Sequence, residues 1–131
     1  MIPEKISILI GSNPTLKDLF VGLYDLSALD LAVLMFLLKS RNPVDVAIVA
    51  RKVERDRSTV LRSLQKMVAL GICSRDVRNL AEGGYYHVYT ASEIKTMKKE
   101  VNRKMHEIHA SLNRLQRRFD KDIGSFTSLP N

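Results

Sequence analysis

A dense run of positive charge occupies residues 51–66, where six basic residues stand against two acids. The bases are Arg51, Lys52, Arg55, Arg57, Arg62 and Lys66. Guanidinium and ammonium groups bind phosphates, and arginine also pairs with the edge of guanine. A surface charged only for solubility would mix both signs more evenly. The run therefore favours contact with nucleic acid over a merely solvated helix face.

The positive charge is unevenly distributed along the chain. The 131 residues hold 21 bases and 14 acids, for a net charge of +7 and a pI of about 9.8. Residues 1–50 hold four bases and five acids. Residues 51–90 hold eight bases and four acids, and residues 91–131 hold nine bases and five acids. A basic domain of this kind attracts nucleic acid or an acidic membrane surface. Because the net charge becomes positive from Arg51 onward, we expect the second half of the chain to bind the acidic partner.

Apolar residues recur with helical spacing between Asp56 and Leu70, which predicts an amphipathic helix. Asp56 is placed as its N-cap, and Gly71 stands where a left-handed residue ends a helix. The apolar stripe would dock on the domain, and the opposite face would enter a major groove. The positions left over are Arg57, Ser58, Thr59, Arg62, Ser63, Gln65 and Lys66. Gln65 is not included among the predicted DNA contacts. We predict that DNA is contacted by Arg55, just before the helix, and by Arg57, Ser58, Thr59, Arg62, Ser63 and Lys66.

Several shorter helices are predicted before this segment. Residues 15–24 have helical spacing, and residues 28–39 follow a capping box of Ser27 and Asp30. The second of these is apolar almost all round and should be central, with a main buried stripe of Leu31, Leu34, Met35 and Leu38. A third helix over residues 46–53 follows an Asp45 cap. Residues 6–10 are expected to form a short strand or an arm.

The hydrophobic period changes to two after Gly71, which predicts strands over residues 72–77 and 85–90 joined by a polar loop. Arg75 and Arg78 could reach a flanking phosphate backbone or minor groove, although an ordinary edge hairpin would carry such residues as well. The order of helix, short helix, turn, longer helix and hairpin is that of a winged helix-turn-helix. The predicted fold class is mainly α with a small β-hairpin (α+β), over residues 14–90.

A long C-terminal helix is predicted from a capping box at residues 90–93 to Gly124, roughly 30 residues later. Its apolar positions are spaced by three and four residues, as in a coiled coil. They are Ile94, Met97, Val101, Met105, Ile108, Leu112, Leu115 and Phe119. We predict that residues 91–124 pair two copies into a homodimer; the alternative is a helix folded back on its own domain. Residues 1–13 would form an N-terminal arm, and residues 125–131 a frayed tail.

Residues 26–30, 56–67, 70–72 and 83–89 together resemble archaeal winged-helix transcription regulators of the TrmB-like and MarR-like groups. The resemblance covers roughly residues 15–120. It implies a dimeric, operator-binding protein whose recognition helix spans residues 57–70. TrmB proteins that sense sugars carry a large C-terminal effector domain, which this chain does not show, so sugar sensing is not expected. Family members often place Gly near Glu54, and we expect this chain to make that turn without positive φ.

Other functional classes have little support. Cys73 is the single cysteine, so no disulfide within the chain is expected, and His106 and His109 lack the companions of a metal site. No phosphate-binding loop or group of catalytic residues indicates an enzyme, and no cofactor is expected.

The longest apolar run, residues 31–38, is too short to span a membrane, so a cytoplasmic protein is predicted. The partner is expected to be double-stranded DNA, with any small-molecule effector unknown.

Two alternatives to a sequence-specific regulator use the same fold. A sequence-independent chromatin protein would use the same basic face through phosphates alone. A winged-helix protein-interaction module would not need that face to be cationic. The sequence does not separate operator binding from chromatin binding, or repression from activation.

Overall fold

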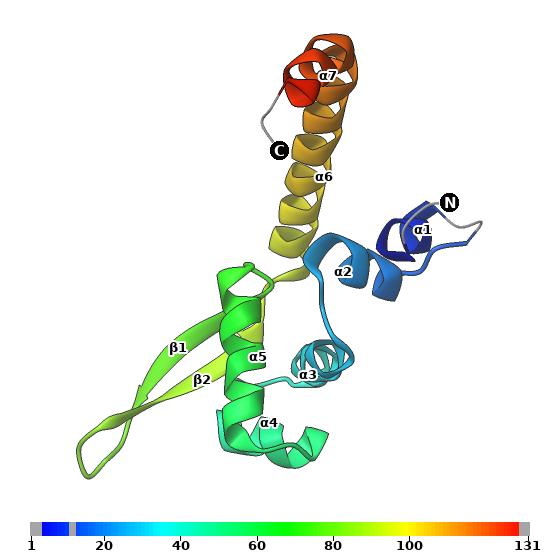
Figure 1. The fold of residues 1–131 in the computed structure, drawn as a ribbon. Helices are drawn as coiled ribbons and strands as arrows, with labels where there is room; N and C mark the ends of the chain where they lie inside the picture. The colour runs from blue at the N-terminus through cyan, green and yellow to red at the C-terminus, as the bar shows by residue number, and fades with distance from the viewer. Residues whose placement is uncertain (1–3, 11–12, 129–131) are drawn as a thin grey trace. The chain divides into compact units, whose positions relative to one another are not determined.

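A computed structural model describes residues 4–10 and 13–128 of the chain (Figure 1). The chain divides into two compact units, residues 1–92 and residues 93–131. The first unit contains α1 (Glu4–Ile10), α2 (Leu16–Tyr24), α3 (Ala28–Lys39), α4 (Val46–Val53), α5 (Arg57–Ala69), β1 (Cys73–Asn79) and β2 (Tyr85–Ala91). The second contains α6 (Ile94–Arg117) and α7 (Phe119–Thr127). The predicted fold class, mainly helical with a two-stranded hairpin, is confirmed.

Polar caps define where the helices of the first unit begin. In the capping box of α3, the Ser27 N–H donates to Asp30 Oδ2 at 2.9 Å and the Asp30 N–H donates to Ser27 Oγ at 3.1 Å. Asp45 caps α4 and Asp56 caps α5 through the same kind of bond. These three predicted caps are confirmed because each satisfies backbone N–H groups that have no partner inside the helix.

The core of the first unit is built around α3, which packs against α4, α5 and β2. Its most deeply buried apolar side chains come from several elements: Val33, Leu34, Val49, Val60, Leu64, Met67 and Ile72. The predicted buried stripe is wrong at two positions, since Met35 is 55% exposed and Leu38 is 45% exposed. A helix that is apolar on nearly every side has no periodicity from which its buried face can be chosen. The two side chains help line an apolar groove of about 390 Å³ between α2 and α3.

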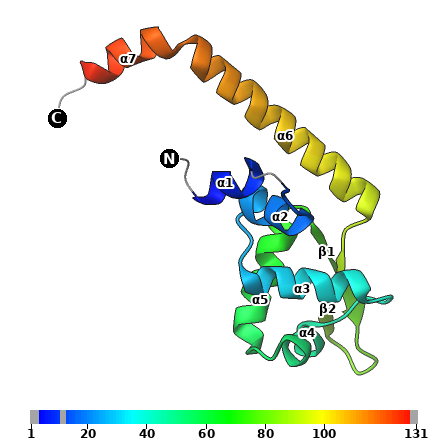
Figure 2. The same cartoon turned by 90° about the vertical axis from the view of Figure 1, so that its right-hand side faces the viewer.

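Residues 4–10 form the helix α1, so the prediction of a short strand or arm is wrong for these residues. Figure 2 shows α1 beside α2, and the two helices are in contact. Gly22 permits this approach, because a Cβ at that position would lie only 2.7 Å from Leu9 Cδ1. The run of apolar residues is too short for its period to distinguish a helix from a strand. Residues 1–3 and 11–12 of the expected arm lie outside the described residues.

The hairpin pairs β1 and β2 in antiparallel register from Cys73 opposite Ala91 to Asn79 opposite Tyr85. Both strands run slightly further than predicted. Val44 adds a bridge to the hairpin: its N–H donates to Tyr89 O at 3.1 Å, and the Tyr89 N–H donates to Val44 O at 2.8 Å. This bridge fixes the start of α4 against the hairpin, and both α4 and the hairpin contact α5.

The second unit differs from the predicted continuous helix. A break at Arg118 separates α6 from α7, and Gly124 lies inside α7 rather than ending a helix. The predicted capping box is also wrong, because Thr90 pairs with Ser74 in the sheet and Ser92 Oγ donates to Gly71 O at 3.0 Å. The predicted frayed tail is helical as far as Thr127, and residues 129–131 lie outside the described residues. None of the described helices is long and apolar enough to cross a membrane.

Candidate nucleic-acid interface

A tight turn joins α4 to α5 and sets where α5 begins. α4 ends at Glu54, which adopts the left-handed conformation with φ 57° and ψ 47°. The N–H groups of Glu54 and Arg55 both donate to Ala50 O. The expectation that this turn would avoid positive φ is therefore wrong. A left-handed non-glycine residue costs roughly 1–2 kcal/mol, which the two hydrogen bonds and the Asp56 cap offset.

Four exposed arginines cluster around this turn and along the first turns of α5. They are Arg51, Arg55, Arg57 and Arg62. Within the described part of the chain, none of their side chains has a hydrogen bond or an ion pair. Arg51, Arg55 and Arg57 line one shallow depression. Glu54 and Asp56 line the same depression, but no ion pair joins them to these arginines among the described residues, so the guanidinium groups can still bind an external anion.

The flank of α5 that faces α3 is organised differently. Ser63 is 5% exposed, and its hydroxyl donates to Asp30 Oδ1 at 2.5 Å. Lys66 Nζ donates to Asp30 Oδ2 at 2.7 Å and to Asp25 O at 2.8 Å. Ser63 is thus buried, and its hydroxyl is engaged by Asp30; its contact with DNA stays a prediction. Lys66 is held in an interhelical network instead of extending from the surface.

Asp30 is ionised at the centre of this network. Burial acts to raise the pKa of its carboxyl group, but hydrogen bonds from Lys66, Ser63 and Ser27 outweigh it and lower the pKa below its ordinary value. The buried carboxylate accepts hydrogen bonds from an ammonium group, a hydroxyl group and a backbone N–H group, which favour its charged form. The network therefore stabilises the packing of α3 on α5 and neutralises the Lys66 charge.

Hydroxyl groups at the start of α5 are also engaged. Asp56 accepts hydrogen bonds from Ser58 Oγ, from Thr59 Oγ1 at 2.7 Å and from the Thr59 N–H at 3.2 Å. These bonds, led by the one from Ser58, hold the pKa of Asp56 well below its usual range. Each hydroxyl has only one proton to donate. Ser58 and Thr59 must therefore leave Asp56 before their hydroxyls can donate to a phosphate.

The outward face of α5 presents Ser58, Arg62 and Gln65, which are all exposed. Their spacing of four and three residues places them on one side of the helix. Gln65 is absent from the predicted contacts, although its amide is suited to paired hydrogen bonds with adenine. The structure thus places Ser58, Arg62 and Gln65 on one side of α5, whereas Arg57 lines the pocket beside the wing. Arg62 also lines a shallow depression together with Ser63 and Lys66.

The wing supplies two arginines from β1. Arg75 is exposed and has no side-chain partner among the described residues. Arg78 donates to Asp76 Oδ2 at 3.0 Å, and both side chains are exposed. The pKa of Asp76 is lowered, first by the Val77 N–H and then by Arg78. An exposed pair of this kind is weak, so a phosphate can displace it.

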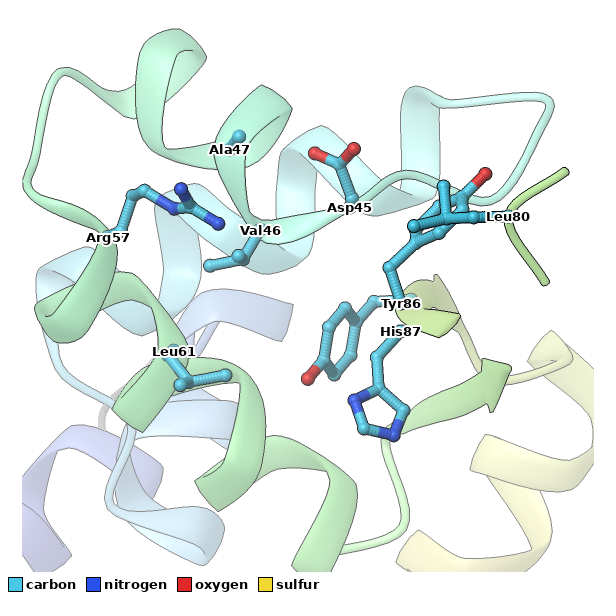
Figure 3. Close-up of a pocket in the computed structure, with 9 residues that line it drawn as sticks. Asp45, Val46, Ala47, Arg57, Leu61, Leu80, Tyr86 and His87 are labelled. Carbon is cyan, nitrogen blue, oxygen red and sulfur yellow. The ribbon is translucent and has the colours of Figure 1, made fainter. Parts of the chain in front are cut away.

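A cavity of about 440 Å³ lies between the wing, the start of α4 and α5. It is lined by Asp45, Val46, Ala47, Arg57, Leu61, Leu80, Tyr86, His87 and Tyr89. Figure 3 shows Arg57 on one side of it, and Tyr86 and His87 projecting from β2 on another. The cavity therefore adjoins the arginine cluster through Arg57.

Metal and thiol chemistry have no support in the described residues. No group of three or more histidine, cysteine, aspartate or glutamate side chains there could hold a metal ion. Burial raises the pKa of the Cys73 thiol to about 12, so it stays protonated and unreactive.

The predicted dimerisation residues occupy the second unit. On α6, Ile94, Met105, Ile108, Leu112 and Leu115 are between 41% and 75% exposed, and Phe119 at the start of α7 is 61% exposed. Met97 is the exception at 7% exposed, and Val101 is intermediate. Most of the apolar seam is therefore accessible in the single chain.

Comparisons with known proteins agree with this geometry. Residues 23–95 match the family described as sugar-specific transcriptional regulator TrmB. An uncharacterised protein of Methanocaldococcus jannaschii is 32% identical over 93 residues, which cover 71% of this chain and 70% of that protein.

Two solved structures share the fold. One is described as a possible transcriptional regulator from Methanosarcina mazei Go1, with a TM-score of 0.70, 22% identity, and coverage of 77% of this chain and 85% of that chain. The other is a protein of the thermoacidophilic archaeon Sulfolobus tokodaii, with a TM-score of 0.59, 19% identity, and coverage of 73% and 93%. At these identities the two structures show the fold alone.

Proposed function

Because this chain belongs to the TrmB family of DNA-binding, winged-helix transcriptional regulators, we propose that it recognises a specific operator in duplex DNA. The observation that carries the proposal is the cluster of four unpaired arginines around the start of α5. An enzyme would need a group of catalytic side chains, whereas the family to which this chain belongs regulates transcription. The arginines leave positive charge available around the start of α5, and a phosphate backbone attracts such charge.

The contacts divide by chemistry. Arg62 and Gln65 lie on the outward face of α5 and are suited to base edges in the major groove. Arg51 and Arg55 lie at the turn before α5 and are suited to phosphates. Arg75 and Arg78 of the wing would contact the flanking backbone. Residues 14–90 would then form the DNA-binding part of the chain.

We further propose that residues 91–124 join two copies into a homodimer through the seam on α6 and Phe119. The support is the apolar area that this seam leaves exposed in one copy, which soluble monomers rarely tolerate. A two-fold dimer would present two copies of α5 about 34 Å apart and read a palindromic site. Simultaneous binding of both half-sites would raise the affinity through effective concentration.

Selection from a pool of random duplex DNA tests the operator. We expect an enriched palindromic motif, with an affinity that falls linearly as the logarithm of the salt concentration rises. A shuffled version of the motif is the control. Binding that is tight and salt-dependent but equal for both sequences would establish a sequence-independent DNA-binding protein. Absence of duplex binding at low salt would instead favour a protein-interaction module.

The dimer is tested with a double variant in the seam, Ile108→Glu with Leu112→Glu. Sedimentation should show monomers, and the affinity for the full site should fall. The matched control is His106→Glu with Ala110→Glu, which adds glutamates to exposed positions on the opposite face of α6. A parent protein that is already monomeric at micromolar concentration would contradict the dimer, as would a helix that folds back on its own domain.

A further inference from the structure

The groove between α2 and α3 is an exposed hydrophobic surface on the first unit. Every residue that lines it is apolar except Lys17, and three of its large side chains, Leu16, Met35 and Leu38, are exposed. Lys17 has no ion pair among the described residues. Exposed apolar patches on soluble proteins commonly mark interaction sites. The groove therefore suits an apolar segment that carries a negative charge at its edge.

The helix α7 carries an exposed apolar stripe on the second unit. Phe119, Ile123 and Phe126 are all exposed, and their spacing of four and three residues places them on one side of the helix. Asp120 and Asp122 fall on the two edges of this stripe, one on each side. Within the described part of the chain, Asp120 has no ion pair or hydrogen bond. The stripe of α7 thus has a free negative charge at one edge.

We propose that α7 of one copy docks into the α2–α3 groove of a second copy of this chain. Amphipathic helices bind apolar grooves through residues with the spacing i, i+4 and i+7, which the stripe of α7 has. The stripe would cover Met35 and Leu38, and Asp120 would lie beside Lys17, whose charge it complements. A two-fold pair would make this contact twice, since each copy has one groove and one α7.

Continuity with the proposed dimer favours a second copy as the occupant. α7 begins at Phe119, the last residue of the seam through which we propose that two copies pair. The inference rests on that proposed homodimer and extends it to the groove. The break at Arg118 allows the stripe of α7 to take a direction different from the seam of α6. Because α3 packs against α5, docking would also fix the separation of the two copies of α5.

The charges beside the stripe disfavour an acidic membrane as the partner of α7. Helices that lie on such membranes carry lysine or arginine on their polar face beside the apolar one. The stripe of α7 is bordered by Asp120 and Asp122 instead, although Asp122 forms an exposed pair with Arg118 at 3.4 Å. Lys121 lies on the opposite side of the helix. Insertion of α7 into vesicles of acidic lipid, with the groove left open, would overturn the proposal.

Disulfide trapping in the full chain tests the contact. Met35→Cys and Phe126→Cys are made as two separate proteins, mixed, left to exchange subunits and mildly oxidised. We expect a disulfide between the two chains, identified by mass spectrometry of the joined peptides. The native Cys73 is buried and its thiol stays protonated, so it should not compete.

The matched control is Lys121→Cys, on the side of α7 that faces away from the stripe. It should be trapped by Met35→Cys far less than Phe126→Cys is. Equal trapping of the two would overturn the proposal. In a chain that carries both Met35→Cys and Phe126→Cys, a disulfide that forms only within one chain would overturn it as well.

Reversal of the charge pair tests the contact without cysteines. Lys17→Glu and Asp120→Lys should each raise the Kd of the dimer roughly threefold in sedimentation, as for an exposed ion pair, and the two changes together should restore it. Lys39→Glu is the control, because Lys39 is exposed on α3 and does not line the groove. No recovery in the Lys17 pair, or equal recovery when Lys39→Glu is combined with Asp120→Lys, would overturn the proposal.

The same measurements separate the docking from the proposed function. A parent that is monomeric at micromolar concentration would refute both the seam and the docking. A dimer that shows no trapping above the Lys121→Cys control would keep the seam and refute the docking alone. Trapping in a protein that binds no duplex DNA would support the docking and refute the operator.

Discussion

The two flanks of α5 carry similar residue types, but only one of them is bonded to α3 through side chains. On the flank toward α3, Ser63 and Lys66 bond to Asp30 and pack the helix onto the domain. On the outward flank, Ser58 and Arg62 are exposed, and Arg62 has no side-chain partner among the described residues. Whether a polar side chain of α5 is tied to the domain therefore depends on whether it bonds to the buried carboxylate of Asp30.

Asp30 determines this difference from a distant point in the chain. It is 4% exposed, and it lies 33 residues before Ser63 and 36 before Lys66. The same carboxylate closes the capping box at the start of α3. One side chain thus fixes the start of the central helix and holds one flank of the recognition helix.

The largest expected effect comes from removing this carboxylate. Asp30→Ala leaves the buried Ser63 hydroxyl without an acceptor, frees Lys66 and opens the capping box. We expect the free energy of unfolding to fall by about 3 kcal/mol, as the sum of an unsatisfied buried polar group and a lost cap. Urea unfolding measures the change.

The matched control is Asp18→Ala in the capping box of α2. Asp18 accepts from the Thr15 N–H at 2.8 Å and, among the described residues, makes no hydrogen bond to another helix. We expect a loss of about 1 kcal/mol or less there. If both variants lose the same stability, the interhelical network contributes nothing beyond the cap, and the contrast between the two flanks has no energetic basis.

The second prediction compares one residue from each flank in DNA binding. Arg62→Ala should weaken operator binding by about 1–3 kcal/mol while leaving the unfolding free energy nearly unchanged. Lys66→Ala should change operator binding by less than about 0.5 kcal/mol and lower the stability by about 1 kcal/mol. Fluorescence anisotropy and urea unfolding give the two values. An affinity loss for Lys66→Ala as large as that for Arg62→Ala would mean that Lys66 leaves Asp30 when DNA binds.

The third prediction uses the titration of Asp30. Its pKa is lowered in the folded chain, below the 3.8 that is ordinary for the carboxyl group. The folded state therefore binds fewer protons than the unfolded state in this window, so stability rises with pH. The contribution of Asp30 to the free energy of unfolding should be complete at pH values above its ordinary pKa of 3.8. It should be lost as the pH falls through the lowered pKa of the folded chain.

Asp30→Asn provides the comparison for this pH dependence. We expect the parent to lose about 1 kcal/mol more than the variant between pH 6 and pH 3, measured by urea unfolding. Asp56 and Asp76, whose pKa values are also lowered, titrate in both proteins and cancel in the difference. Parallel curves for parent and variant would show that the Asp30 network adds no pH-dependent stability.

Local signals in the sequence were sufficient for most of the first unit. The caps at Ser27, Asp45 and Asp56 and the change of period after Gly71 need only neighbouring residues, and the elements they delimit are confirmed. The bond between Asp30 and Lys66 depends on tertiary packing, and no spacing rule indicates it. The break at Arg118 likewise has no Gly or Pro to mark it.

The smallest expected effect concerns Glu54, in the turn that joins α4 to α5. Glu54 has φ 57°, a conformation that glycine adopts without steric cost. Glu54→Gly should therefore raise the free energy of unfolding by about 0.5–1 kcal/mol, since relief of the left-handed strain exceeds the added chain entropy. Glu54→Val should destabilise the protein, because a β-branched residue is poorly tolerated at positive φ.

Glu54 also carries charge beside the arginine cluster, so a charge control is required. Glu54→Gln removes the negative charge and retains the side chain. Both Glu54→Gly and Glu54→Gln should tighten DNA binding to a similar small degree, because both remove a carboxylate near Arg51 and Arg55. Only the glycine variant should gain stability. A gain of equal size in the glutamine variant would attribute the effect to charge repulsion, and the backbone of this turn would then store no strain.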